Sequence, residues 1–538
     1  MIARYLRTLT FLKFTQIRYR LFYLLRNRIL SLLPKRRFEP VPARGSNLRF
    51  EGMMPSRSSY DPAERKFTFL NRARSFEGPI DWDFKEYGIL WSWNLNYFDY
   101  LQQPGMNEQD GIRLILDYLN RLDSDSQGLA AYPTSLRLMN WIKFVCTHHI
   151  SNRKVDGWMR AQYVQLGKTI EYHLLGNHLM ENGFALLFGA YYFRDDNLLR
   201  AARKILIAEL DEQVLEDGGH FELSPLYHQI ILGRVLDCLN LVTANPWKND
   251  DLLHILRDKA AVMLGWLEQI AFSDGSVPMV NDSPVSIAPT CDHLQKYARR
   301  LAVEPLKKPL SQSGYRKIVA GRAELVVDVG SVGAEYFPAH AHADTLNFEL
   351  ALSGNRLIVD SGVSTYAKND ERQYQRSTAA HNTVVIDGRD SSEVWGGFRV
   401  GRRARPFDLR QREADFITVV ECAHDGYRHL SGKPVHKRRW EMGKDGLRII
   451  DRVEGGNQKA VSRLHFHPDA AVSKHAGSQS GEVHFHGNVL GWKARRGRAV
   501  IVNTRYYPDF GISNANQCIE IGLENGIGDV EIKWDATA

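Results

Sequence analysis

The chain has 538 residues, enough for more than one domain, and its 43% hydrophobic and 25% charged content is that of a folded globular protein. Its five cysteines are scattered and form no CxxC pair, which argues against a disulfide framework and against a thiolate metal site. The net charge of +8 arises at the start, because residues 1–37 hold ten Lys or Arg and no acid; the rest is near neutral, so no general nucleic-acid-binding surface is indicated.

The basic segment 1–37 mixes Leu, Phe and Tyr with the positive charges. Charges interrupt it too often for a transmembrane helix, and it shows no apolar stretch with a small-residue cleavage site. The pattern is typical of an amphipathic helix on an anionic membrane surface, and a basic helix packed on its own protein or on a partner is the alternative. We therefore expect a cytoplasmic or membrane-peripheral protein, with the periplasm as the alternative location.

Residues 38–80 read as a loop-rich N-terminal arm with one strand at 66–70. From 81 to 308 apolar residues recur at three- and four-residue spacing, which predicts helices, for example at 111–119, 198–210 and 229–241. Repeated helical hairpins of this kind build a curved bundle or toroid. From 309 to 538 short β-type runs alternate with Gly, Asn and Asp, at 324–329, 416–420, 447–451 and 499–502, and predict a large antiparallel β-sandwich.

The stretch 176–183 places three polar side chains at helical spacing. Asn177 and Glu181 share a helix face, and His178 reaches Glu181 at i+3. A carboxylate beside a histidine fixes its tautomer and raises its pKa. The simpler interpretation is that Asn177, which follows Gly176, caps the helix.

A second polar stretch covers residues 216–228. Ser224 suits a helix cap and Pro225 the first helical position, which puts Tyr227 in the first turn. The helix dipole there favours a phenolate, and a Tyr of lowered pKa can act as base and as acid. A tyrosine that simply packs at a helix start is the alternative.

Aromatic and polar residues cluster near 91–98 and 135–141. Aromatic faces stack on sugar rings, and Asn and Arg bind hydroxyls and carboxylates. The composition is that of a sugar-binding site, although core packing explains the Trp residues equally well. The candidate contacts are Trp93, Asn96, Arg137 and Asn140.

Metal-ligand residue types gather between 340 and 381. In an extended segment His340 and His342 lie on one face, so one ring can bind a metal while the other faces substrate. Asp360 follows a hairpin at 353–355, and His381 comes soon after. Imidazoles with a carboxylate suit Zn²⁺, whereas surface histidines beside a hairpin are the alternative. In a straight strand His342 would lie about 23 Å from the Asp360 end of the hairpin, so the segment must fold back.

Taken together and in this order, these motifs resemble the heparinase II/III family of polysaccharide lyases. The most specific similarities are Asn177-His178 with Glu181, Gly218-Gly219-His220 with Tyr227, His340-Ala341-His342-Ala343-Asp344, Asp360-Ser361-Gly362 and His381-Asn382. The resemblance implies an incomplete (α/α) toroid followed by an antiparallel β-sandwich, with the active site between them. The basic opening segment looks more like family members found beside bacterial surface-polysaccharide synthesis genes than like secreted degradative members.

The resemblance also implies roles for single residues. Asn177 and His178 would bind the carboxylate of a uronic acid, with Glu181 holding His178. Tyr227 and His340 would transfer protons in a β-elimination that needs no redox cofactor or nucleotide. A structural zinc ion would be held by His342, Asp360 and His381. The expected partner is an anionic polysaccharide, and no nucleic acid is expected.

Two other functions remain open. A glycoside hydrolase on a similar toroid needs two carboxylates across the scissile bond, and Glu181, Asp217 and Glu222 are candidates. A non-catalytic glycan-binding component of bacterial polysaccharide assembly would tolerate loss of the Tyr227 hydroxyl. The residue types beside these carboxylates, His, Asn and Tyr, suit elimination better than hydrolysis.

Overall fold

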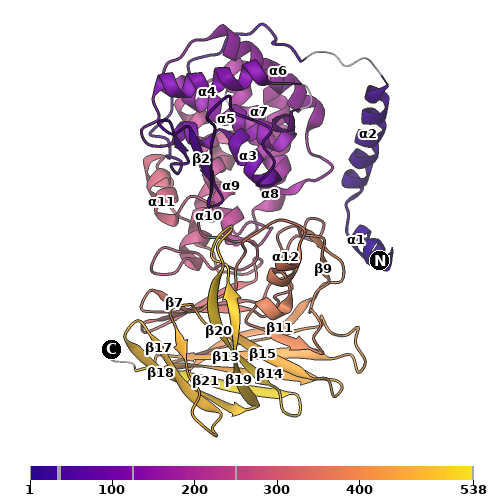
Figure 1. The fold of residues 1–538 in the computed structure, drawn as a ribbon, viewed down its shortest axis with the longest axis vertical. Helices are drawn as coiled ribbons and strands as arrows, with labels where there is room; N and C mark the ends of the chain where they lie inside the picture. Colours follow the sequence, from indigo (N-terminus) through magenta and orange to yellow (C-terminus); the bar gives the residue numbers. More distant parts are fainter. Residues whose placement is uncertain (1, 33–37, 124–125, 249–250, 536–538) are drawn as a thin grey trace.

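The computed structural model describes residues 2–32, 38–123, 126–248 and 251–535. A helical domain stacks end to end on a domain of antiparallel sheets, and a separate pair of helices at the N-terminus lies beside them (Figure 1). The predicted fold class, a toroid of helices followed by a β-sandwich, is confirmed. The end of the basic segment, residues 33–37, lies outside the described residues.

The helical domain follows a small N-terminal sheet. That sheet, in the order β1-β2-β3, contains the strand expected near 66–70, since β2 spans Lys66–Phe69. The other bounds are β1 Tyr60–Asp61, β3 Arg72–Ser75, α3 Ile89–Tyr97, η1 Asp99–Gln102, α4 Glu108–Arg121, η2 Gln127–Leu129, α5 Ala131–Thr147, α6 Arg153–Thr169, α7 Gly176–Phe193, α8 Asp196–Gln213, α9 Pro225–Ala244, α10 Leu252–Ile270 and α11 Cys291–Arg300.

Helices of the toroid follow from capping and apolar spacing. In α4, Asn107 caps the helix by accepting a hydrogen bond from the Asp110 amide, and the buried Leu114, Ile115 and Tyr118 recur at helical spacing. Helices α5, α7 and α9 are instead buried along nearly their whole length. A helix that is apolar on most sides belongs inside a domain, and α7 and α9 carry the candidate site.

The sandwich consists of one eight-stranded and two four-stranded antiparallel sheets. Their orders are β11-β12-β13-β14-β21-β18-β17-β16, β19-β20-β15-β8 and β4-β5-β6-β7. The bounds are β4 Tyr315–Ala320, β5 Ala323–Asp328, β6 Phe348–Leu352, β7 Asn355–Ile358, α12 Asp370–Gln375, η3 Thr378–Ala380, β8 Val384–Ile386, β9 Val394–Trp395, β10 Arg399–Val400, β11 Pro406–Ala414, β12 Ile417–His424, β13 Val435–Gly443, β14 Gly446–Glu454, β15 Ala460–His465, β16 Ala471–Val472, β17 Ser480–Phe485, β18 Asn488–Arg496, β19 Arg498–Tyr506, β20 Asn514–Gly522 and β21 Ile527–Lys533.

Alternation of side chains builds the sandwich core. Along β13 every second residue is buried, including Trp440 and Met442, which pack with Leu350 of β6 and Ile519 of β20 in one apolar cluster. The cluster joins residues of all three sheets. A smaller cluster, which includes Trp266 of α10 and residues of β4 to β6, joins the toroid to the first sheet of the sandwich.

The His-rich segment folds back, as the expected metal site requires. Strands β6 and β7 form the predicted hairpin, with Leu352 opposite Asn355, and the Asp360 amide donates to the Glu349 carboxylate at 2.9 Å. Asn347 then donates its side-chain amide to Asp360 at 2.6 Å. Side-chain atoms of Asp344 and Asp360 lie within 4.8 Å of each other, although Asp344 precedes Glu349 by five residues, or about 16 Å of extended strand. The chain before β6 therefore turns back toward the end of β7 and does not continue as a straight strand.

The N-terminal helix pair consists of α1 (Ile2–Leu9) and α2 (Phe14–Ser31). Helix α2 stands beside the toroid, and α1 lies lower, near β9 and α12 (Figure 1). Among the described helices, none combines the length and the apolar character needed to cross a bilayer.

Candidate active site

Asn177 lies in the first turn of α7. The helix begins at Gly176 after Leu175, so Asn177 does not occupy the cap position, and the capping interpretation is wrong. The backbone N–H and the side-chain Nδ2 of Asn177 both donate to Oε1 of Glu222, at 3.0 and 2.9 Å. Glu222 therefore fixes the orientation of the carboxamide.

Glu222 is a site residue that the sequence suggested only as a hydrolase carboxylate. It is 1% exposed, and its Oε2 has no hydrogen-bond partner among the described residues. That oxygen lies 3.6 Å from Nε2 of His340. Burial raises the pKa of Glu222, although His340 and the Asn177 donors lower it. A buried carboxyl with a raised pKa can hold a proton between Asn177 and His340.

His178 is held by Glu171 and not by Glu181, which corrects the prediction. Its Nδ1 lies 3.0 Å from Oε1 of Glu171, and Asn182 supports the same carboxylate from α7. Burial disfavours the charged imidazole, but Glu171 outweighs this effect and raises the pKa of His178. Glu181 forms an ion pair with Arg234 of α9 at 3.2 Å instead, because a fully buried carboxylate needs a charged partner.

Tyr227 stands over His340. Ser224 caps α9 by accepting from the Tyr227 amide at 3.3 Å, and Pro225 is the first helical residue, as predicted. The Tyr227 and His340 rings stack with centroids 3.8 Å apart, and the Tyr227 hydroxyl lies 3.4 Å from that of Tyr366. Burial, with Tyr366 nearby, raises the pKa of Tyr227 well above its usual range. The expected phenolate is therefore not favoured, and Tyr227 holds its proton at rest.

One buried carboxylate, that of Asp282, contacts both histidines of the His-x-His motif. His340 Nδ1 lies 2.9 Å from Oδ2, and His342 Nε2 lies 2.9 Å from Oδ1. Arg372 donates to both oxygens, at 2.5 and 2.7 Å. Burial opposes ionisation, but Arg372 and the histidines hold the pKa of Asp282 well below its usual range. Asp282 is therefore an anion that only accepts hydrogen bonds.

The contacts of Asp282 assign the hydrogens of the two rings. Because an ionised carboxylate cannot donate, His340 carries a hydrogen on Nδ1 and His342 carries one on Nε2. Neutral His340 then has a lone pair on Nε2, the atom nearest Glu222. Burial lowers the pKa of His342 to about 3 despite Asp282, so its lone pair lies on Nδ1, which has no partner among the described residues.

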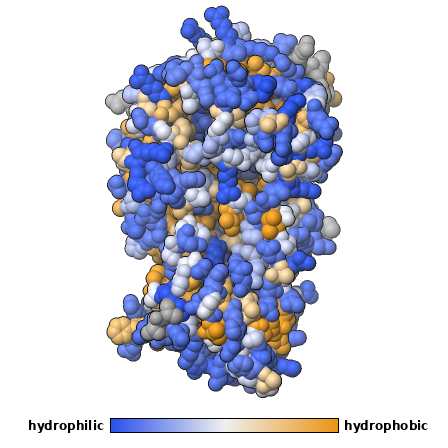
Figure 2. Space-filling model, turned by 60° about the vertical axis from the view of Figure 1, so that its left-hand side comes forward, coloured by the Kyte–Doolittle hydropathy of each residue, from blue (hydrophilic) through white to orange (hydrophobic). Residues whose placement is uncertain are grey.

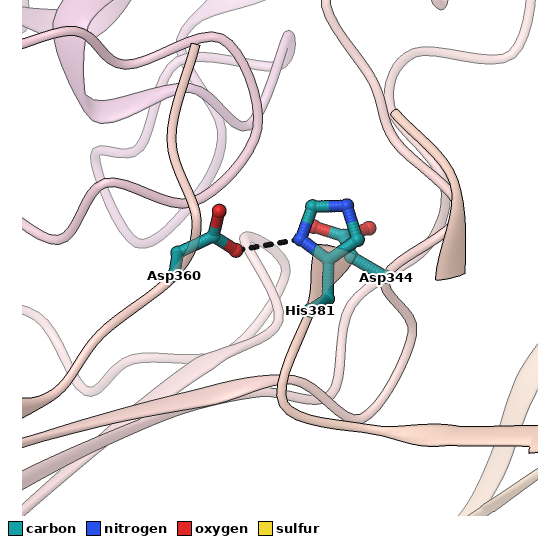
Figure 3. Close-up of side chains that lie close together, drawn as sticks. All are labelled: Asp344, Asp360 and His381. Carbon is teal, nitrogen blue, oxygen red and sulfur yellow. Dashed lines mark hydrogen bonds and ion pairs between the residues drawn. The ribbon is translucent and has the colours of Figure 1, made fainter. Parts of the chain in front are cut away.

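A buried group of potential metal ligands lies next to His342. Ligand atoms of Asp344, Asp360 and His381 lie within 4.8 Å of one another, and His381 Nδ1 is 2.7 Å from Oδ2 of Asp360 (Figure 3). The His342 and His381 ring centroids are 5.2 Å apart. Both Asp360 oxygens accept hydrogen bonds, whereas His342 Nδ1, His381 Nε2 and Asp344 Oδ2 are unpartnered among the described residues. Two imidazoles and two carboxylates fit Zn²⁺ in donor type. Asp344 was not among the predicted ligands.

Two family models together match most of this chain. The model described as "Heparinase II/III N-terminus" matches residues 140–303, and the one described as "Heparinase II/III-like, C-terminal" matches residues 303–522. The chain belongs to the heparinase II/III family. All the residues around Asn177, His340 and Asp360 described above lie within these matches.

Two curated relatives of this heparinase II/III chain are named for different properties, one for its localisation and one for a lyase activity. FtsZ-localized protein C of Caulobacter vibrioides is 25% identical over 367 residues, which are 63% of this chain and 61% of that protein. A heparin-sulfate lyase of Bacteroides stercoris is 25% identical over 327 residues, which are 55% of this chain and 46% of the lyase. The chain thus spans less than two thirds of either relative.

Solved heparinase structures share the fold. A crystal structure of heparinase III superposes with a TM-score of 0.65 at 17% identity, covering 86% of this chain and 80% of that chain. The heparan sulfate lyase HepC from Pedobacter heparinus gives a TM-score of 0.56 at 17% identity, covering 88% of this chain and 82% of that chain. At this level of identity the similarity establishes the fold alone.

Three predicted sugar contacts of the heparinase II/III chain lie in its interior, which corrects the prediction. Asn96, Arg137 and Asn140 are at most 2% exposed. Arg137 donates to the Gly128 carbonyl at 2.8 Å, and Asn140 donates to the Tyr97 carbonyl at 2.9 Å. These side chains satisfy backbone carbonyls inside the toroid, which buried polar groups must do. Glu181, fully buried and paired, is not available to substrate either.

Trp93 is the predicted sugar contact that stays partly exposed. Its ring lies 6.2 Å from Tyr132, which lies 4.5 Å from His178, so an aromatic surface leads to the site. Tyr132 and Arg234 were missed. Helical periodicity contained a signal for Arg234, because it lies seven residues after Tyr227, on the same face of α9.

Proposed function

We propose that this chain is a polysaccharide lyase that cleaves a uronic-acid-containing polysaccharide by β-elimination. The observation that carries the proposal is the stacked Tyr227–His340 pair beside Asn177 and His178. In this reaction a base removes the proton at C5 of the uronate while an acid protonates the leaving oxygen O4. The C5 proton is not acidic while the neighbouring carboxylate is fully charged, so that carboxylate needs hydrogen bonds or a cation.

Each side chain has a role that its contacts support. His340, with Nδ1–H on Asp282, offers the Nε2 lone pair as the base for C5. Tyr227, which is protonated at rest, is the acid for O4. Asn177 and the cationic form of His178 stabilise the charge that develops on the uronate carboxylate. The raised pKa of His178 favours that cationic form.

The hydrolase alternative is less well supported. Inverting and retaining hydrolases need two carboxyl groups facing each other across the substrate. Glu181 is paired with Arg234, and Asp217 accepts hydrogen bonds from the Ser311 and Ser313 amides at 2.8 and 3.0 Å. Of the three candidates only Glu222 adjoins the Tyr227–His340 pair.

The proposed substrate is an anionic polysaccharide. Relatives are named heparin-sulfate lyases, which act on such a polymer by their names. On this chain the cationic form of His178 and the partly exposed Arg234 are the charges that favour an acidic sugar. A bacterial surface polysaccharide rich in uronate fits these groups as well as a glycosaminoglycan does.

We also propose that the chain binds one structural zinc ion. Asp360, His381 and His342 through Nδ1 would hold it, with Asp344 as a further donor. The ion would supply positive charge that balances these buried carboxylates. Asp282 would orient His342 through Nε2–H, as carboxylates commonly orient metal-bound histidines. The Tyr227–His340 pair would not contact the zinc ion, because His340 lies on the side of Asp282 that faces the substrate.

The test is a screen of uronate-containing bacterial polysaccharides by the ultraviolet absorbance of the unsaturated product. On a cleaved polymer, Tyr227→Phe and His340→Ala should each lower turnover about 10²–10⁴-fold. Tyr87→Phe, which removes a hydroxyl that donates to the Ala73 carbonyl, is the matched control. New reducing ends without absorbance would indicate a hydrolase, and wild-type turnover by Tyr227→Phe would contradict the mechanism.

The two histidines provide a second readout. His340→Ala should lose activity and keep zinc, whereas His342→Ala should lose both. The opposite pattern would mean that the two rings have been assigned the wrong way round. If the wild-type chain cleaves no polysaccharide and neither variant changes its function, the result would favour the glycan-binding alternative.

A further inference from the structure

The N-terminal helix pair is turned with its polar side inward. The residues of α2 that contact the toroid are Gln16, Tyr19, Arg20, Tyr23 and Arg26, at helical spacing. Most of them bind backbone carbonyls of the loop between α6 and α7; Gln16 reaches Leu174 O at 3.0 Å and Arg20 reaches His173 O at 3.2 Å. Helix α2 is therefore held on the toroid mainly by hydrogen bonds and aromatic contacts.

The opposite side of the pair exposes large apolar residues. Leu24 and Leu25 of α2 are 68% and 64% exposed, and Phe14 is 77% exposed. The others on the two helices are Ile2, Leu6, Leu9, Ile17, Leu21, Phe22 and Ile29. A surface helix of a soluble protein shows the reverse arrangement, with its apolar side toward the core. Figure 2 shows the side away from the helix pair, which is mainly hydrophilic with separate small apolar groups. A concentration of exposed apolar residues such as that on the helix pair marks an interaction surface.

The charge of the helix pair is entirely positive. Residues 2–32 contain seven Lys or Arg and no Asp or Glu. Arg4 and Arg7 pair with Glu393 of the sandwich, and Lys13 pairs with Glu212 of the toroid. Arg18 and Arg28 lie among the exposed apolar residues. The outward surface is therefore both apolar and cationic.

We infer that the outward face of α1 and α2 binds an anionic phospholipid bilayer, lying in the interface plane. A bilayer surface offers anionic headgroups for the arginines and acyl chains for the leucines, and it matches both properties. A polysaccharide would satisfy the charges but not the leucines. A second copy of the chain would bring two positive helix pairs together, which charge repulsion opposes.

Docking by this face places the domain junction at the lipid surface. Tyr5 packs on Trp395 with ring centroids 4.6 Å apart, and the loop beyond it carries Phe398, 6.2 Å from His340. Helix α2 contacts the loop 170–174, which carries Glu171, the partner of His178. The two segments that border the candidate site, the loop with Glu171 and the loop with Phe398, therefore lie against the membrane-facing helices.

The experiment is co-sedimentation of the full chain with vesicles of phosphatidylcholine alone and with phosphatidylglycerol added. The test variant is Leu21→Ser, Leu24→Ser and Leu25→Ser together. The matched control is Val319→Ser, Phe416→Ser and Val489→Ser, which removes three exposed apolar residues elsewhere. We expect binding to anionic vesicles that weakens with salt and falls about tenfold or more in the test variant, while the control binds like wild type.

Several results would overturn the inference. They are no binding to anionic vesicles at low salt, equal binding to neutral vesicles, or unchanged binding by the test variant. A wild-type dimer in solution that the test variant converts to a monomer would show that a second copy covers the face. Circular dichroism and thermal unfolding of all three proteins verify that the substitutions leave the fold intact.

Discussion

At the scale of single residues, the Asp282 carboxylate gives two neighbouring histidines different chemistry. It binds Nδ1 of His340 and Nε2 of His342, so the free lone pairs lie on different ring positions. The Nε2 atom of His340 lies 3.6 Å from Glu222, whereas the ring of His342 lies 5.2 Å from that of His381. The alternation of an extended segment does not by itself produce this division, since both rings leave the chain on the same side.

The first prediction concerns Glu222. Replacing it by Gln keeps an oxygen that can accept from Asn177 but removes the acidic proton. If the protonated carboxyl stabilises the uronate carboxylate, Glu222→Gln should lower turnover about 10²-fold with little change in KM. The pH–rate profile should also lose one limb. Glu324→Gln, at a buried ion pair away from the site, is the control. If the variant turned over at the wild-type rate, the role of Glu222 would be limited to orienting Asn177.

The second prediction concerns Glu209 of α8. Burial raises the pKa of Glu209 to about 7 from an ordinary 4.5, although a hydrogen bond from Gln213 lowers it. The pKa of Glu209 is higher in the folded state than in the unfolded state. The free energy of unfolding is therefore at its full value below about pH 4.5 and falls by roughly 3 kcal/mol as the pH rises through about 7.

Glu209→Gln should remove this dependence. Denaturant unfolding at about pH 8 should show the variant more stable than wild type, and the difference should vanish at about pH 4. Asp211→Asn, an exposed neighbour on the same helix, is the control. A difference that stays constant with pH would show that Glu209 does not titrate in this range.

At the scale of elements, the site depends on loops as much as on the helices that carry it. Glu171 lies between α6 and α7, and Phe398 lies between β9 and β10. Both segments contact the N-terminal helix pair: Tyr19 stacks on Tyr172 with ring centroids 4.7 Å apart, and Tyr5 packs on Trp395 with ring centroids 4.6 Å apart. The pair therefore supports residues on both sides of the domain junction.

The third prediction tests this support. Tyr19→Ala with Tyr23→Ala should increase the amide hydrogen exchange of residues 170–174, because their contacts with α2 are lost. Leu24→Ala with Leu25→Ala, on the outward side of the same helix, should leave that exchange unchanged. Equal protection in both variants would show that the loop holds its conformation without α2.

At the scale of the whole molecule, the proposed zinc site lies where the sheets converge. Asp344 precedes β6 and Asp360 follows β7, whereas His381 precedes β8 of another sheet. Arg438 of the eight-stranded sheet donates to the Leu346 carbonyl at 3.0 Å and is held by Asp451. An ion bound here would connect segments of separate sheets, so its loss should affect the sandwich as a unit.

The fourth prediction follows from that position. Purified protein should contain about one zinc per chain, and Asp360→Ala should lose both the metal and about 3 kcal/mol or more of stability, because it also leaves His381 without its carboxylate. Metal analysis and thermal unfolding measure the two effects. Asp469→Ala, an exposed acid of the same domain, is the control. A metal-free wild type of equal stability would contradict the proposal.

The sequence alone determined the features that depend on local order. Periodicity located helices such as α4 and α9 and strands such as β5 and β14, and the Ser224–Pro225 pair marked the start of α9, because capping and burial patterns act within a few residues. The motifs from Asn177 to His381 identified the family. The same local patterns misassigned Asn96, Arg137 and Asn140. Arg137 and Asn140 lie on α5, which is buried on nearly all sides, and Asn96 lies on the buried side of α3, so residue type alone did not show that they face the interior.

Only the tertiary structure decided which charges meet. Glu171 replaced Glu181 as the partner of His178, Arg234 took Glu181, and Asp282 joined His340, His342 and Arg372 across sequence separations of 58 to 90 residues. Local spacing offers each polar group several partners. Burial selects among them, because a charge removed from water is stable only beside the group that the whole fold brings to it.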